Sequence, residues 1–69
     1  MATRSEQQAQ LESDILSYAS RYYTYGGMCH CLEAGAKLKM RIDRTLQKLR
    51  RASKIKYYRD GAAIVWQLA

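Results

Sequence analysis

The sequence predicts a small, mainly α-helical domain that ends in a β-hairpin. Apolar residues recur at spacings of three and four over most of residues 5–52, which is the period of helices with one buried face. Residues 55–68 change to two β-prone runs around Asp60-Gly61. The chain of 69 residues contains no proline, and 48% of it is hydrophobic, which is too much for a disordered segment. A chain this short buries on folding only ~60% of the surface that its unfolded form exposes to solvent, and it has little room for a catalytic cleft.

Residues 1–4 are expected to form a flexible arm, and a first helix is expected over about residues 5–24. Thr3 with Glu6, or Ser5 with Gln8, has the spacing of a capping box that binds the first free backbone amides. Apolar residues then form one stripe at helical spacing: Leu11, Ile15, Tyr18, Ala19 and Tyr22. This helix is expected to support the later ones, and its acidic surface argues against contact with a phosphate backbone.

A bend at Gly26-Gly27 is expected to separate this helix from a short second helix over about residues 28–36. The β-branched or aromatic residues 22–25 favour a very short extended segment before the glycines. The second helix contains Cys29-His30-Cys31, but the chain has no further cysteine or histidine that could complete a zinc site. A Cys–His nucleophile would also lack an orienting acid. No metal, cofactor or enzymatic activity is therefore predicted.

The third helix, over about residues 40–52, has the clearest pattern in the chain. At about 100° per residue, Ile42, Leu46 and Leu49 fall on one side and are expected to be buried. The other side carries cations and hydrogen-bonding residues: Arg41, Arg44, Thr45, Gln47, Lys48 and Arg51. Arginine binds guanine edges or phosphate with two hydrogen bonds, and glutamine binds adenine, so this composition is suited to the major groove.

The hairpin is expected over about residues 55–68, with Asp60-Gly61 as the two-residue loop of a type I′ turn. Because an isolated hairpin is marginal in water, one of its faces must pack on the helices, and Trp66 is the expected anchor. Lys56 and Arg59 are then expected near the hairpin tip, beside the basic helix.

Charge is distributed unevenly along the chain. Residues 1–34 contain two cationic and four anionic side chains, a net charge of −2, whereas residues 35–69 contain ten and two, a net charge of +8. Such a concentrated positive field costs self-repulsion, and a polyanion is the usual partner that makes it useful. A solvated helix face is the simpler explanation of the same charges.

The order of these elements resembles the winged helix-turn-helix family of DNA-binding domains, as does the string TLQKLRRASKIKYYRDGAAIVWQL from Thr45 to Leu68. In that family a leucine pair in the third helix precedes a short link, an isoleucine that opens the wing, and a glycine at the tip. The ending Gly61 to Leu68 is also similar to small pilus-operon regulators. By element order the resemblance covers nearly the whole chain and implies a three-helix winged helix-turn-helix over residues 5–69.

The resemblance also implies which side chains bind DNA. The third helix would present Arg41, Arg44, Thr45, Gln47, Lys48 and Arg51 to the major groove, and the wing would present Lys56 and Arg59 to flanking phosphates or the minor groove. Lys39 and Lys54, at the two ends of the helix, complete the candidate site. The chain departs from the family at residues 36–39, which lack a capping residue, so residues 28–52 could instead form one long helix.

The leading hypothesis is a sequence-specific regulator of transcription, of the phage or plasmid kind, that binds double-stranded DNA, with a homodimer as the expected form on DNA. One alternative is a module that docks on an acidic host protein, or inhibits one, with the bend of Tyr22, Tyr23, Tyr25 and Gly26-Gly27 as its hot spot. Another is single-strand binding through Tyr57 and Tyr58. No apolar run approaches the ~20 residues of a membrane span, and a cytoplasmic location is predicted.

Overall fold

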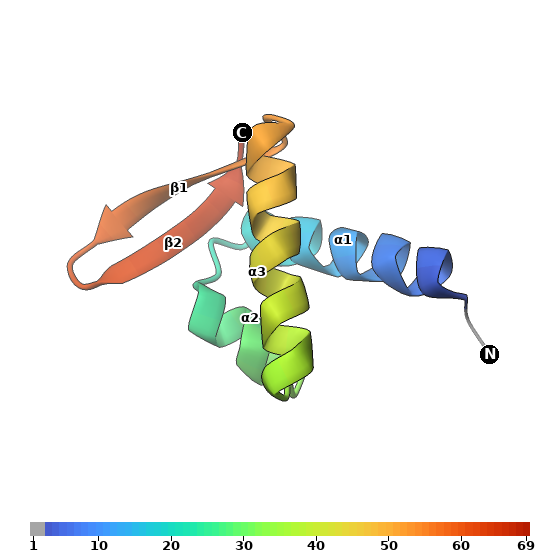
Figure 1. The fold of residues 1–69 in the computed structure, drawn as a ribbon. Helices are drawn as coiled ribbons and strands as arrows, with labels where there is room; N and C mark the ends of the chain where they lie inside the picture. Colours follow the sequence, from blue (N-terminus) through green and yellow to red (C-terminus); the bar gives the residue numbers. More distant parts are fainter. Residues whose placement is uncertain (1–2) are drawn as a thin grey trace.

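The computed structural model describes residues 3–69, which form three helices followed by an antiparallel hairpin (Figure 1). The helices are α1 (Arg4–Ser20), α2 (Tyr25–Cys31) and α3 (Ala36–Arg51), and the strands are β1 (Ile55–Asp60) and β2 (Ala63–Leu68). The expected layout, mainly helical with a C-terminal hairpin, is confirmed. Residues 1 and 2 of the expected flexible arm lie outside the described residues, but Thr3 caps α1 and Arg4 is helical, so the arm does not extend to residue 4.

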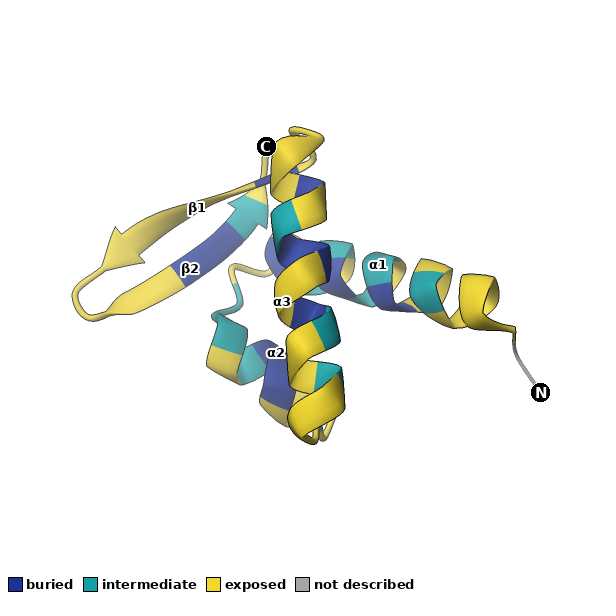
Figure 2. Ribbon diagram, viewed as in Figure 1, coloured by how far each residue is buried: buried dark blue, intermediate teal, exposed yellow. Residues whose placement is uncertain are grey.

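One apolar core lies where the helices meet the base of the hairpin. Its largest fully buried side chains come from four elements: Ile15, Met28, Ile42, Leu46 and Ile55. Trp66 of β2 is 5% exposed and packs in the same cluster, which confirms it as the anchor of the hairpin. Figure 2 shows that the first turns of α1 and most of β1 extend beyond this core and are exposed.

All three helices end in the same hydrogen-bonded motif, and none of them uses glycine for it. The residue after each C-cap has a left-handed φ, namely Tyr22 (61°), Glu33 (50°) and Ser53 (59°). In each case the next amide donates to the carbonyl five residues earlier, as Tyr23 N does to Tyr18 O at 3.1 Å. This arrangement is the Schellman motif, and the stacked rings of Tyr18 and Tyr23, with centroids 5.0 Å apart, supply its usual apolar contact.

These ends correct the predicted helix boundaries. The first helix stops at Ser20, not near residue 24, so Tyr22 lies outside its buried stripe and is 61% exposed. The second helix stops at Cys31, not at residue 36. Between α2 and α3, Glu33 has a left-handed conformation and Gly35 an extended one, and both interrupt the helical backbone. The alternative prediction of a single helix over residues 28–52 is therefore wrong.

The helix starts also differ from expectation. The second helix begins at Tyr25, not at residue 28, because Thr24 Oγ1 accepts a hydrogen bond from Gly27 N at 3.0 Å and caps it. Gly26 and Gly27 therefore lie within the first turn of α2. The third helix begins at Ala36, four residues earlier than predicted, although its N-cap Gly35 offers no side chain to the first amides.

The hairpin strands pair from Ile55–Leu68 to Asp60–Ala63, which leaves Gly61 and Ala62 as the loop. Within this loop only Gly61 has a positive φ, 62°, which fits a type II′ turn, so the predicted type I′ loop at Asp60-Gly61 is wrong. The expected extended segment is confirmed at the other edge of β2. There Thr24 bridges to Val65, and Trp66 N donates to Tyr23 O at 2.9 Å, which ties the hairpin to the α1–α2 link.

Candidate nucleic-acid interface

The side of α3 turned away from the core is a cationic surface. Ile42, Leu46 and Leu49 are at most 2% exposed and set the direction of the core. Residues about half a turn away, which we call the outward face, are Lys37, Met40, Arg44, Gln47, Lys48 and Arg51. Figure 1 shows α3 in front of α1 and α2, so this face is open, and Met40 is 59% exposed among the cations.

The residues predicted to bind DNA are in three situations. The exposed ones are Lys39, Arg44, Lys48, Arg51, Lys54, Lys56 and Arg59. Arg41 and Gln47 are half-buried. Thr45 is 2% exposed, and its hydroxyl donates to Arg41 O at 2.7 Å and accepts from Gln8 Nε2 at 3.0 Å. The prediction that Thr45 faces the major groove is therefore wrong.

On one side of α3, polar groups of α1 contact its cations. Arg41 Nη2 donates to Gln8 Oε1 at 3.2 Å, so the Gln8 amide joins Arg41 to Thr45. One turn further along α1, Glu12 Oε1 lies 2.9 Å from Lys48 Nζ, the only ion pair within residues 3–69. A hollow between the two helices, which we call the α1 groove, is lined by Arg4, Ser5, Gln7, Gln8, Ala9, Glu12, Arg41, Arg44 and Lys48.

On the other side of α3, an aromatic ring of the hairpin contacts a cation. The Arg50 guanidinium carbon lies 4.8 Å from the centroid of the Tyr57 ring, and this ring packs on Trp66 with centroids 5.4 Å apart. The strand register places Arg59 on the same face as Tyr57 and Lys56 on the opposite face. The two hairpin cations therefore do not share one surface, and only the face with Arg59 continues from the contact with α3.

Sequence reasoning missed four residues of this candidate interface: Arg4, Gln8, Glu12 and Arg50. Gln8 and Glu12 are one turn apart on α1, but their partners follow tens of residues later, at a separation of 37 for Gln8 and Thr45. No local spacing contains such a pairing. Arg50 lies between the apolar and outward faces of α3, where neither pattern singled it out.

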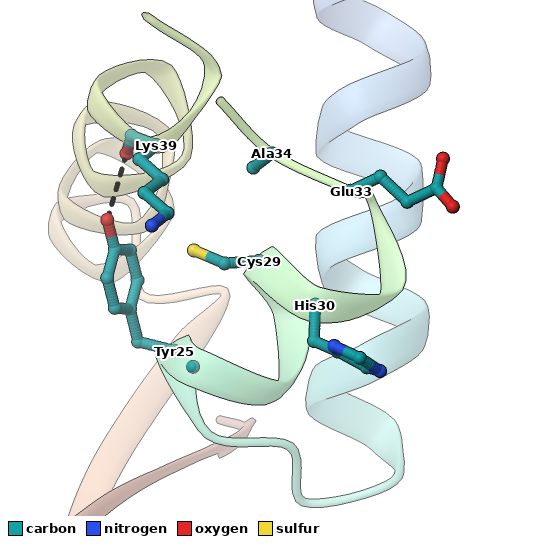
Figure 3. Close-up of a pocket in the computed structure, with 7 residues that line it drawn as sticks. Tyr25, Cys29, His30, Glu33, Ala34 and Lys39 are labelled. Atoms are coloured by element: carbon teal, nitrogen blue, oxygen red, sulfur yellow. Dashed lines mark hydrogen bonds between the residues drawn. The ribbon is translucent and has the colours of Figure 1, made fainter. Parts of the chain in front are cut away.

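A second hollow lies beside α2 and is lined by Cys29 and His30 of the Cys29-His30-Cys31 triplet, but not by Cys31 (Figure 3). Its Tyr25 hydroxyl donates to Lys39 O at 3.2 Å. Burial, and next the neighbouring Cys29 side chain, raises the pKa of Tyr25 above its usual 10.0. Figure 3 shows the Cys29 thiol pointing toward Tyr25 and Lys39, whereas the His30 ring extends to the other side. Within the described chain, no three His, Cys, Asp or Glu residues form a group that could hold a metal ion.

The comparisons with known proteins give no family model, no curated protein and no solved structure that matches this chain. The physical properties of the described surface are therefore the basis for assigning a function. None of the helices in residues 3–69 has the length and apolar character that crossing a bilayer requires.

Proposed function

We propose that this chain is a winged helix-turn-helix regulator that binds double-stranded DNA through the outward face of α3. One observation carries the proposal. Four cations of that face, Lys37, Arg44, Lys48 and Arg51, are exposed, and among the described residues only Lys48 is paired with a carboxylate. Unpaired cations on one convex ridge repel each other, and a polyanion relieves that repulsion.

The outward face of α3 has the dimensions and chemistry required to contact base edges in the major groove. An α-helix with its side chains is about 10–12 Å across and enters the major groove, which is about 12 Å wide. Arg44 and Arg51 can each bind a guanine edge with two hydrogen bonds, and Gln47 can bind adenine. Met40, the exposed apolar residue of the face, fits a thymine methyl group.

Titration of the protein with duplex DNA over a range of salt concentrations tests this function. The slope of log affinity against log salt should change by about 0.9 for each phosphate contacted. Arg44→Ala should reduce discrimination between a selected duplex and a scrambled one, because the lost contact is to a base. Arg21→Ala, at the C-cap of α1, removes the same charge from an exposed position that belongs neither to the outward face nor to the α1 groove, and it is the control. Absence of duplex binding at low salt would rule out the function.

Two exposed apolar side chains favour a second candidate, in which the same cations dock on an acidic protein. Tyr22 is 61% exposed and Met40 is 59% exposed, and such side chains carry interface energy. The half-buried Tyr23 and Tyr25 contribute less than the sequence suggested, because they pack within the molecule. Capture of one acidic protein that survives nuclease treatment, together with failure to bind duplex DNA, would favour this candidate.

A further inference from the structure

We propose, resting on the function proposed above, that the α1 groove is a phosphate-binding site for the DNA strand on the side of α3 opposite the hairpin. The sequence patterns assigned DNA contacts to α3 and the hairpin alone. The groove adds Arg4, Ser5 and Gln8 of α1 to the interface and gives Glu12 a role as a competitor for the same cation.

The charges that line the groove support an anionic ligand. Four cationic side chains converge there, with Arg4 from α1 and Arg41, Arg44 and Lys48 from α3, against the single carboxylate of Glu12. Two of them, Arg44 and Lys48, also belong to the outward face, so the groove adjoins the surface proposed to enter the major groove. A ligand that occupies both would be a continuous polyanion.

A helix that lies in the major groove has a phosphate backbone along each of its two sides. Since the helix nearly fills the groove, one phosphate-bearing strand passes along each flank of it. Figure 1 shows the hairpin on one side of α3 and the N-terminal half of α1 on the other. The hairpin offers Arg59 to one strand, and α1 offers Arg4 and Ser5 to the other.

The wall of the groove is held in place by hydrogen bonds between its two helices. Gln8 accepts from Arg41 at 3.2 Å and donates to the buried Thr45 at 3.0 Å, so it fixes this part of α1 against α3. The groove therefore exists before a ligand arrives. A preformed site loses less conformational entropy on binding than one assembled from mobile side chains.

Glu12 forms an ion pair with Lys48, a cation that a phosphate in the groove would also contact. The Lys48 side chain is 65% exposed and that of Glu12 is 26% exposed, so their contact at 2.9 Å is accessible to solvent and to competing anions. Exposed ion pairs are weak, and a phosphate that also contacts Arg4 displaces the carboxylate from Lys48. Glu12 thereby lowers affinity for any polyanion and makes full engagement of the groove a condition for tight binding.

The test measures the salt dependence of binding to one mixed-sequence duplex for two matched pairs of variants. Arg4→Gln should lower the magnitude of the salt slope by about 0.9, whereas Arg21→Gln, which removes the same charge from the other end of α1, should leave it unchanged. Glu12→Gln should tighten binding by about two- to fivefold. Asp14→Asn, which removes the same charge from a residue that accepts a hydrogen bond from Gln10 outside the groove, should change binding less.

The results separate this site from the proposed function itself. If the parent protein binds the duplex but Arg4→Gln matches Arg21→Gln and Glu12→Gln matches Asp14→Asn, the groove site is wrong and the function stands. If the parent does not bind duplex DNA, both are wrong. Far-UV circular dichroism spectra that coincide for all four variants at the temperature of the binding measurement would show that each variant is folded and that the differences do not arise from unfolding.

Discussion

The two sides of α3 hold their cations by different physics. On the α1 side, Lys48 pairs with the carboxylate of Glu12, and Arg41 donates a hydrogen bond to the amide oxygen of Gln8. On the hairpin side, Arg50 lies over the Tyr57 ring, which in turn packs on Trp66. Ion pairs at a surface are screened by salt and can be replaced by another anion, whereas a cation on a ring backed by apolar packing is held more firmly. The α1 side is thus the side at which a ligand can compete.

The largest expected effect concerns the anchor of the hairpin side. Trp66→Ala should lower the free energy of unfolding by about 3–5 kcal/mol, because it leaves a cavity beneath the Tyr57 ring. A domain of this length has only about 3–10 kcal/mol in total, so the variant should be largely unfolded at room temperature. Urea unfolding followed by circular dichroism measures this. Leu68→Ala, on the same strand but 46% exposed, is the control, and a similar loss for both would contradict the assigned role of Trp66.

A smaller loss is expected on the α1 side. Thr45→Val keeps the shape of the buried side chain but removes the hydroxyl that joins Gln8 to the Arg41 carbonyl, and it should cost about 1 kcal/mol. Urea unfolding is again the measurement, with the exposed Ser13→Ala on α1 as the control. An unchanged or increased stability of Thr45→Val would show that these hydrogen bonds do not hold the two helices together.

A glycine in place of Glu33, in the turn between α2 and α3, should stabilise the protein. Glu33 has a φ of 50°, which an L side chain adopts at a cost, so Glu33→Gly should raise the free energy of unfolding by about 1 kcal/mol. Glu33→Ala removes the carboxylate but keeps the Cβ and should give no such gain. An equal gain from both variants would assign the effect to charge instead of backbone conformation. Thermal melts of the three proteins decide between these outcomes.

Salt should distinguish the two sides directly. In low salt, Glu12→Gln is expected to cost about 0.2–1 kcal/mol of stability, and this cost should disappear near 1 M salt because the ion pair is screened. Tyr57→Leu, which removes the ring beneath Arg50, should cost about 0.5–1 kcal/mol or more at every salt concentration. Urea midpoints measured at low and high salt test this contrast, and equal salt dependence of the two variants would contradict it.

The smallest effect should appear at alkaline pH. The raised pKa of Tyr25 means that the folded protein holds the phenol proton more firmly than the unfolded chain does. Its stabilising contribution is complete below about pH 10 and is lost as pH rises through the folded pKa. Tyr25→Phe should therefore show a shallower fall of the urea midpoint between about pH 9 and pH 11 than the parent. Parallel pH profiles would show that this residue is not responsible.

The helix boundaries show where sequence reasoning lost accuracy. Glycine is the usual signal for a helix end, but here the left-handed positions are occupied by Tyr22, Glu33 and Ser53. The two adjacent glycines lie inside the first turn of α2 instead. Reading Gly26-Gly27 as a break therefore placed the end of α1 too late and the start of α2 too late.

The sequence by itself determined that this chain has three helical segments and a hairpin, and that Arg44, Lys48 and Arg51 of α3 lie opposite Ile42, Leu46 and Leu49. These features follow from residues three or four apart or from adjacent strands, so local spacing contains them. Only the tertiary structure decided that Thr45 is buried, that Glu12 pairs with Lys48 and that Arg50 lies on Tyr57. The first two of these depend on how α1 crosses α3 and the third on where the hairpin packs, because helical spacing gives the direction of a side chain but not its distant neighbour.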